Sequence, residues 1–326
     1  MRVLVTGGAG YVGSVTVEAL VEAGHVTVVL DDCSTGHAAA VVAGARLVRA
    51  DYTNEATTTA LLRDERIEAV VHCAARSLVG ESIRDPARYY RQNVAGGVAL
   101  LEACRTAGVQ RFVFSSTAAV YGTPEATPID EDAPLRPINP YGETKRTFEA
   151  ALTWYGQAYG LRSVILRYFN VAGATAANGE DHDPETHLIP NILRAAEGRG
   201  ALTLFGDDYP TRDGTCVRDF VHVEDLADAH VLALEHLERG GASAAVNLGT
   251  GVGSTVQEVL DTARAASGVD IPSDVVGRRP GDPVELVADN HLAAALLGWT
   301  PTRSLHEIVA SAWAWHAAHP DGYGAR

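Results

Sequence analysis

A tyrosine and a lysine four positions apart are the first residues whose spacing indicates chemistry. Tyr141 and Lys145 lie in the heptapeptide NPYGETK (residues 139–145), whose proline predicts the start of a helix that carries both side chains on one face. A free tyrosine has a pKa of about 10, and a neighbouring ammonium is expected to lower it. Such a pair can move a proton to and from a hydroxyl group.

Composition sets Lys145 apart. It is the only lysine among 326 residues, and arginine supplies the other 25 basic side chains. An exposed tyrosine–lysine pair on a helix is the ordinary alternative. However, the lysine falls four residues after one of only 11 tyrosines. A compact ammonium also offers donors that a planar guanidinium does not. We therefore predict that Tyr141 and Lys145 are catalytic.

A threonine completes the predicted catalytic group. Residues 112–114 predict a buried strand, so Ser115, Ser116 and Thr117 follow at the carboxyl edge of a parallel sheet, where ligands bind. We expect Thr117 to bind a substrate hydroxyl and to relay its proton to Tyr141. The alternative is that these hydroxyls only satisfy the end of the strand.

A glycine loop near the N-terminus predicts a dinucleotide site. GGAGYVG (residues 7–13) follows a predicted strand and opens a predicted helix, and it satisfies both the GxGxxG and the GxxGxxG spacing. Such a loop lets the backbone approach a pyrophosphate at the helix N-terminus. Asp31 ends the second predicted strand, where a carboxylate binds ribose hydroxyls and repels a 2′-phosphate. We therefore predict NAD rather than NADP, although Asp31 could also be an acid in a surface turn.

The elements that must position these residues alternate along the first half of the chain. Apolar, β-branched runs at residues 3–5, 26–30, 47–48, 69–73, 112–114 and 164–166 predict parallel strands, and residues 14–23 and 89–107 predict helices between them. The fold class is therefore α/β, a Rossmann-type doubly wound sheet with a smaller C-terminal α/β substrate-binding lobe. We expect an NAD-binding domain over residues 1–170, which residues 217–248 rejoin, and a second, substrate-binding domain over residues 171–326.

Charge and cysteine content restrict the partners. A formal net charge of −15 argues against nucleic acid. The four cysteines are far apart and form no CxxC pair, so we expect free thiols and no metal site. The apolar N-terminal stretch is too short for a signal peptide, and no segment reaches membrane-spanning length. We expect a cytoplasmic protein without a membrane partner.

Further motifs extend to the C-terminal half. They are RYFN (167–170), HLIP (187–190), LFGDDYP (204–210), RDFVHVEDL (218–226) and RRPGD (278–282). Together with the glycine loop and the Tyr141–Lys145 pair, they resemble the extended short-chain dehydrogenase/reductase family over nearly the whole chain. Within that family the likeness is to the UDP-hexose 4-epimerases.

The resemblance implies two sets of binding residues. NAD would be bound by Gly7, Gly10, Tyr11, Val12, Gly13, Asp31, Asp51, Tyr52, Cys73, Ala74, Ala75, Asn93, Ser115, Tyr141, Lys145 and Tyr168. A UDP-hexose would be bound by Thr117, Tyr141, Phe169, Asn170, His187, Leu188, Thr203, Leu204, Phe205, Arg218, Arg279 and Asp282. In this pattern the arginines hold the diphosphate and Asp282 holds the uridine ribose. Ion pairs of Arg218 or Arg279 with acids are the alternative.

The resemblance also implies an activity and an assembly. These are reversible C4 epimerisation of UDP-glucose and UDP-galactose through a 4-keto sugar with tightly held NAD, in a homodimer formed by the helices around residues 89–107 and 143–159. Epimerisation of UDP-glucuronate or UDP-N-acetylhexosamines stays open, as does a non-catalytic NAD-binding protein. Leu286 stands where some relatives carry a tyrosine that limits room at sugar C2, and Arg76 stands where some carry a lysine. Ala118 and Ala119 replace the acidic pair of 4,6-dehydratases.

Overall fold

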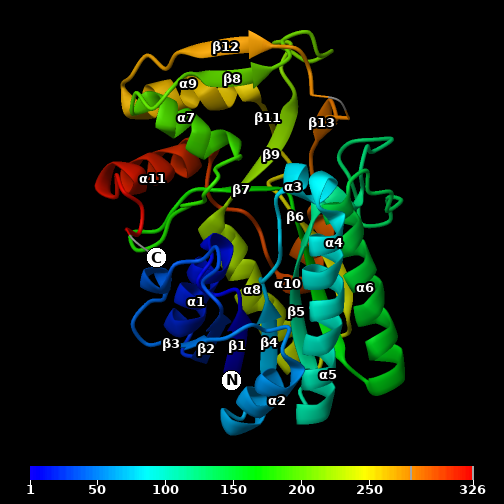
Figure 1. The fold of residues 1–326 in the computed structure, drawn as a ribbon. Helices are drawn as coiled ribbons and strands as arrows, with labels where there is room; N and C mark the ends of the chain where they lie inside the picture. Colours follow the sequence, from blue (N-terminus) through cyan, green and yellow to red (C-terminus); the bar gives the residue numbers. More distant parts are fainter. Residues whose placement is uncertain (280, 325–326) are drawn as a thin grey trace.

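The structure, a computed structural model, describes residues 1–279 and 281–324. Its largest element is a sheet of seven parallel strands in the order β10-β6-β5-β4-β1-β2-β3 (Figure 1). The strands are β1 (Arg2–Thr6), β2 (Val26–Asp31), β3 (Arg46–Arg49), β4 (Ala69–His72), β5 (Arg111–Thr117), β6 (Arg162–Tyr168) and β10 (Ala244–Leu248). Every strand predicted in the first half of the chain is present, and the strand order confirms the Rossmann-type doubly wound fold.

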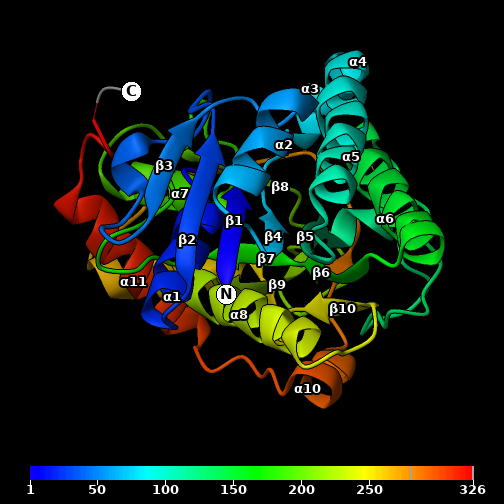
Figure 2. The same cartoon turned by 90° about the horizontal axis from the view of Figure 1, so that it is seen from below.

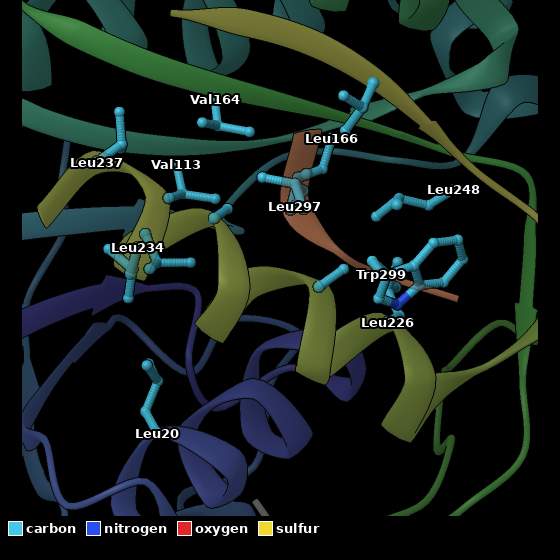
Figure 3. Close-up of a cluster of buried hydrophobic side chains, with 14 of the residues drawn as sticks. Leu20, Val113, Val164, Leu166, Leu226, Leu234, Leu237, Leu248, Leu297 and Trp299 are labelled. Atoms are coloured by element: carbon cyan, nitrogen blue, oxygen red, sulfur yellow. The ribbon is translucent and has the colours of Figure 1, made fainter. Parts of the chain in front are cut away.

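Helices cover both faces of this sheet, as Figure 2 shows from below. One face carries α1 (Tyr11–Glu22) and α8 (Val223–Glu238), with α10 (His291–Leu297) beside α8, and the other carries α2 (Glu55–Asp64), α5 (Gly97–Ala107) and α6 (Pro140–Tyr159). Figure 3 shows Val113 and Leu166 of the strands in one buried cluster with Leu226 and Leu234 of α8. Because the central strands β1, β2 and β4 are buried on both faces, their sequences are almost continuously apolar, whereas the edge strand β3 is partly exposed.

The helix predicted over residues 89–107 is divided in the structure. It consists of α4 (Pro86–Tyr89), a π-helical segment η2 (Tyr90–Gly96) and α5. Asn93 lies in this wider turn, accepts a hydrogen bond from the Arg76 amide at 2.8 Å, and donates one to Thr144 Oγ1 at 3.0 Å. The π-helical turn thus ties the loop after β4 to helix α6.

A second lobe lies beyond the carboxyl ends of the large sheet (Figure 1). Its strands form one sheet of β11 (Gly253–Thr255), β9 (Val217–His222), β13 (Glu285–Leu286) and β7 (Asn170–Ala172), and a pair of β8 (Leu202–Phe205) and β12 (Ser273–Val276). Its helices are α7 (Leu188–Ala196), α9 (Val256–Ser267) and α11 (Leu305–Ala318). The chain crosses between the lobes at residue 222, because β9 pairs within the small sheet whereas α8 and β10 belong to the large one.

Short elements complete the described part of the chain. They are η1 (Ala38–Ala40), α3 (Val79–Arg84) and η3 (Ala118–Val120). Among the described helices, none combines the length and the apolar character that crossing a membrane requires. All four cysteines are free thiols.

Candidate active site

A cleft of about 1540 Å³ extends from the glycine loop to strand β13 of the second lobe. It brings together every predicted catalytic residue, every predicted substrate-binding residue and all but one of the predicted cofactor-binding residues. The exception is Asn93, which lies behind the cleft and is bonded to Arg76 and Thr144. Residues far apart in sequence therefore share one cavity.

The glycine loop is closely packed against its neighbours. Gly7 has a φ of +73°, and a Cβ there would lie 2.5 Å from the Ala74 amide nitrogen. A Cβ at Gly13 would lie 2.0 Å from the Gly7 carbonyl oxygen. Only glycine fits these positions. No side chain caps the N-terminus of α1, and this end of the helix lines the cleft. Its free amide groups are therefore available to bind an anion.

Asp31 lies at the end of β2, directly beside that loop. Its carboxylate accepts hydrogen bonds from the amides of Ala9 at 3.0 Å and Cys33 at 2.8 Å. Burial raises the pKa of Asp31, and the two amides oppose that effect. The carboxylate thus stands in the cleft next to the anion-binding turn.

Helix α6 places the catalytic pair. Asn139 caps the helix by accepting a hydrogen bond from the Gly142 amide at 2.9 Å, and proline occupies the first turn. A Cβ at Gly142 would lie only 2.5 Å from the Ala119 carbonyl oxygen, so the helix starts in close contact with the turn that follows β5. This contact brings Tyr141 within hydrogen-bonding reach of the Thr117 side chain.

Lys145 is buried one turn further along α6. Its side chain is enclosed, and Nζ donates a hydrogen bond to the Ser115 carbonyl oxygen at 2.7 Å. Nζ lies 4.8 Å from the Phe114 ring centroid and 6.0 Å from that of Tyr141. Burial lowers the pKa of Lys145 to about 8, although Cys73 and Glu149 oppose it.

We expected the Lys145 ammonium to lower the pKa of Tyr141, and this prediction is wrong for the protein without its cofactor. Burial raises the pKa of Tyr141 to about 12, and only the hydrogen bond with Thr117 acts in the other direction. The physical reason is desolvation, which disfavours the charged phenolate in an enclosed site. The positive charge of a bound cofactor would act against this shift.

A buried histidine behind the catalytic pair escaped the sequence analysis. His230 of α8 has its Nε2 2.5 Å from the Tyr168 hydroxyl, and its Nδ1 2.9 Å from the Leu226 carbonyl oxygen. The Tyr168 hydroxyl also contacts Ser115 Oγ at 2.6 Å. Burial lowers the pKa of His230 to about 4, so the ring is neutral at pH 7. Only the fold, which packs α8 under β5 and β6, indicates this contact.

The opposite wall of the cleft carries the guanidinium groups. Arg218 of β9 forms an ion pair with Asp282 and donates to the Val217 carbonyl oxygen at 2.7 Å. The Arg279 guanidinium lies 3.8 Å from the centroid of the Phe205 ring. The ion pair considered for Arg218 is thus present within the cleft, so it does not remove the guanidinium from a ligand's reach.

Several other predicted residues line the same part of the cleft. Phe169 and Asn170 stand where β6 passes into β7, and Thr203 and Leu204 belong to β8. His187 is the N-cap residue of α7, and Leu188 is its first residue. Arg76 and Leu286 also line the cleft.

Comparisons with known proteins agree with this geometry. The model of the NAD dependent epimerase/dehydratase family matches residues 3–249. The UDP-glucose 4-epimerase of Lactobacillus helveticus is 51% identical over 327 residues, which cover 99% of each chain. The structure of UDP-glucose 4-epimerase from Brucella ovis in complex with NAD is similar with a TM-score of 0.94 and 47% identity, and covers 96% of this chain and 97% of that one.

The structure of a third relative contains a dinucleotide and a uridine nucleotide. It is the UDP-glucose 4-epimerase from Bifidobacterium longum in complex with NAD⁺ and UDP, with a TM-score of 0.93, 34% identity, and coverage of 99% of this chain and 100% of that one. The family model covers most of the described sheet, and the relatives match the chain from end to end. The chain therefore belongs to the NAD dependent epimerase/dehydratase family.

Proposed function

We propose that the protein interconverts UDP-glucose and UDP-galactose by inverting C4 of the hexose. The observation that carries this proposal is one cleft lined by the half-buried Tyr141 and Thr117, the buried Lys145, and the guanidinium groups of Arg218 and Arg279. Proton-transfer groups and diphosphate-binding groups thus face the same space. The relative from Lactobacillus helveticus, named UDP-glucose 4-epimerase and 51% identical, supports the same activity.

The residues around the glycine loop fit NAD. Gly7 and Gly13 leave room for a diphosphate at the start of α1, and Asp31 offers a carboxylate to ribose hydroxyls. When bound, NAD⁺ supplies the two-electron acceptor and donor for C4 and a positive charge that favours the Tyr141 phenolate. Lys145 has three N–H donors, of which the Ser115 carbonyl takes one, so it can also hold cofactor hydroxyls.

Tyr141 is then the base and the acid of the reaction. As a phenolate, Tyr141 takes the proton of the sugar C4 hydroxyl, while Thr117 bonds to both oxygens and aligns them. A 4-keto sugar would result when C4 also gives up its hydride, which bound NAD⁺ would accept and later return to the other face of C4. Arg218 and Arg279 hold the diphosphate while the hexose turns its other face, and Tyr141 returns the proton to the inverted C4 oxygen. No net oxidation occurs.

UDP-N-acetylhexosamines and UDP-glucuronate are alternative substrates for C4 epimerisation, and the assay must distinguish them from UDP-galactose. Leu286 lines the cleft and is half-buried. By the family resemblance it stands at the position that limits the size of the substituent on sugar C2. UDP-N-acetylglucosamine and UDP-glucuronate are therefore tested beside UDP-galactose. After Thr117 come Ala118 and Ala119, which carry no acid for a 4,6-dehydration.

The decisive experiment uses the purified protein with UDP-galactose and no added NAD, and follows the formation of UDP-glucose. We expect turnover, and we expect Tyr141→Phe to lower kcat at least about a hundredfold because general acid–base catalysis is lost. NAD content, measured after denaturation, should be unchanged in the variant. Tyr159→Phe, at an exposed position of the same helix, is the control and should keep full activity. Absence of turnover in NAD-loaded protein would favour a non-catalytic NAD-binding role.

We also propose that the chain forms a homodimer through α5 and α6. Exposed aromatic side chains gather on α6 and on η2, which leads into α5: Trp154 is 67% exposed, Tyr159 53% and Tyr90 43%. Burying them between two copies would form a helical bundle. Light scattering at two concentrations should give twice the chain mass, and Trp154→Glu should give a monomer. A monomeric wild-type protein at both concentrations would contradict the proposal.

Composition supports a cytoplasmic location, because free thiols are typical of a reducing compartment. We infer that residues 1–170, rejoined by residues 223–248 and not by β9 (Val217–His222), which pairs within the second lobe, bind NAD, and that the second lobe binds the nucleotide sugar. Residues 325 and 326 lie outside the described part of the chain.

A further inference from the structure

Four side chains with metal-binding atoms converge in the segment between β7 and α7. They are Glu180, His182, Glu185 and His187, here called the 180–187 cluster, and each offers one atom such that all four atoms lie within 4.8 Å of one another. All four residues line the cleft, so an ion has a path of entry. The cysteine pattern of the sequence predicts no metal site, and the metal-binding atoms of this segment belong to glutamate and histidine side chains instead.

The distances within the cluster suit a tetrahedral ion. His187 Nδ1 lies 2.8 Å from Glu180 Oε1 and 2.9 Å from Glu185 Oε1. His182 Nδ1 lies 3.0 Å from Glu180 Oε1 and 3.8 Å from Glu185 Oε2. Zinc–ligand bonds of about 2.1 Å in a tetrahedron separate the ligand atoms by about 3.4 Å. The four ligand atoms lie within 4.8 Å of one another, so shortening the longest separation by up to about 1.4 Å would place all four around one ion.

The two carboxylates of the 180–187 cluster are buried and are therefore stabilised by a neighbouring positive charge. The side chains of Glu180 and Glu185 are only 6% and 1% exposed. Among the residues that the structure describes, their ion-pair partners are the two imidazoles and no arginine. A cation is thus strongly favoured between these carboxylates.

We propose that the 180–187 cluster binds a divalent transition-metal ion of the zinc class. Two imidazole nitrogens and two carboxylate oxygens form a donor set that suits Zn²⁺ or Co²⁺ better than Mg²⁺ or Ca²⁺, which prefer oxygen ligands. The ion displaces the protons that the Nδ1 atoms share with the carboxylates. Two backbone amides, those of Thr186 and His187, already orient Glu185 Oε1 at 2.6 and 2.7 Å. The site does not depend on the proposed function.

Cobalt titration tests the site directly. Purified protein, cleared of metals with a chelator and still carrying its nucleotide, is titrated with Co²⁺ and followed by visible absorption. We expect one Co²⁺ per chain, with the intense bands of tetrahedral coordination, and displacement by one equivalent of Zn²⁺. No sulfur-to-cobalt band is expected in the near ultraviolet, because the ligands are nitrogen and oxygen atoms. Zn²⁺ should also raise the Tm.

Variants locate the ion. The double variant His182→Ala/His187→Ala, and separately the near-isosteric Glu185→Gln, should lower Co²⁺ affinity at least about 10- to 100-fold, the loss seen even for outer-shell changes. His291→Ala is the matched control, because His291 is exposed and lies 2.7 Å from the Asp289 carboxylate. Circular dichroism without metal checks the fold. Absence of stoichiometric tetrahedral Co²⁺, or equal affinity in folded variants, would show that the cluster consists of imidazolium–carboxylate pairs only.

Discussion

Burial acts in opposite directions on the pKa values of the two catalytic side chains. It raises the pKa of Tyr141 to about 12 and lowers that of Lys145 to about 8. Both shifts favour the neutral forms, because the low-dielectric wall of the cleft disfavours charge. The charge on Lys145 therefore depends on its few direct contacts, of which the 2.7 Å hydrogen bond to the Ser115 carbonyl is the shortest.

Replacing Lys145 by arginine tests this dependence. Arginine keeps the charge but cannot place a compact ammonium beside Ser115 within a buried space that fits lysine. We expect kcat to fall about 10- to 100-fold, which corresponds to the loss of one hydrogen bond of a charged group. Steady-state kinetics with UDP-galactose measures this effect. Arg146→Lys, an exposed change one residue further along α6, should leave kcat near that of the wild type, and equal kcat in both variants would contradict the prediction.

The residues that sequence reasoning found and missed differ in a physical way. Tyr141 and Lys145 carry their own signal, because their spacing follows the helix period and lysine is otherwise absent. His230 carries none, since it lies within an ordinary helical stretch and meets Tyr168 only through packing. The 180–187 cluster likewise arises because one loop folds back on itself at the cleft.

At the scale of elements, the contact between the start of α6 and the turn after β5 sets the site. Gly142 lies in the first turn of α6, and any Cβ there would meet the Ala119 carbonyl oxygen at 2.5 Å. Backbone atoms cannot yield as a flexible side chain does. The distance between Tyr141 and Thr117 therefore depends on the absence of a methyl group at residue 142.

We predict that Gly142→Ala lowers kcat more than it changes KM for UDP-galactose. The added methyl group pushes the first turn of α6 away from Ala119, and misplacement by about 1 Å can cost a hundredfold in rate. Gly156→Ala is the control, because Gly156 lies near the other end of α6, where the nearest atom to its Cβ, the Leu161 carbonyl oxygen, is 3.0 Å away. Unaltered kcat in Gly142→Ala would show that the contact does not position Tyr141.

The sequence predicted the positions of the β-strands better than the points at which an α-helix changes into a π-helix. Buried β-branched runs mark β1, β2 and β4 plainly, because parallel strands covered on both faces have no polar side. The π-helical η2 could not be predicted, since its hydrogen-bond pattern leaves no periodic mark over residues 90–96. Residues 217–238 form a strand followed at once by a helix, and no glycine or proline separates the two.

At the scale of the whole molecule, buried neutral histidines link stability to pH. Burial lowers the pKa of His72 to about 3 and the pKa values of His222 and His230 to about 4. In the unfolded chain these imidazoles titrate near pH 6.5. Between about pH 6.5 and 4 the unfolded state thus binds more protons than the folded state. The three groups therefore make the protein lose stability as pH falls through that window.

His72→Gln isolates one of these contributions. His72 lies in β4, and its Nδ1 is 2.7 Å from Thr6 Oγ1, a hydrogen bond that glutamine can replace without a titrating group. We expect the variant to be less stable at pH 7, but its free energy of unfolding should fall less steeply below pH 6.5, by up to about 1.4 kcal/mol per pH unit. Urea unfolding at pH 7, 6 and 5 measures both slopes. His291→Gln, whose ring is exposed in the folded protein, should keep the wild-type slope. A wild-type slope in His72→Gln would show that His72 is not held neutral by the fold.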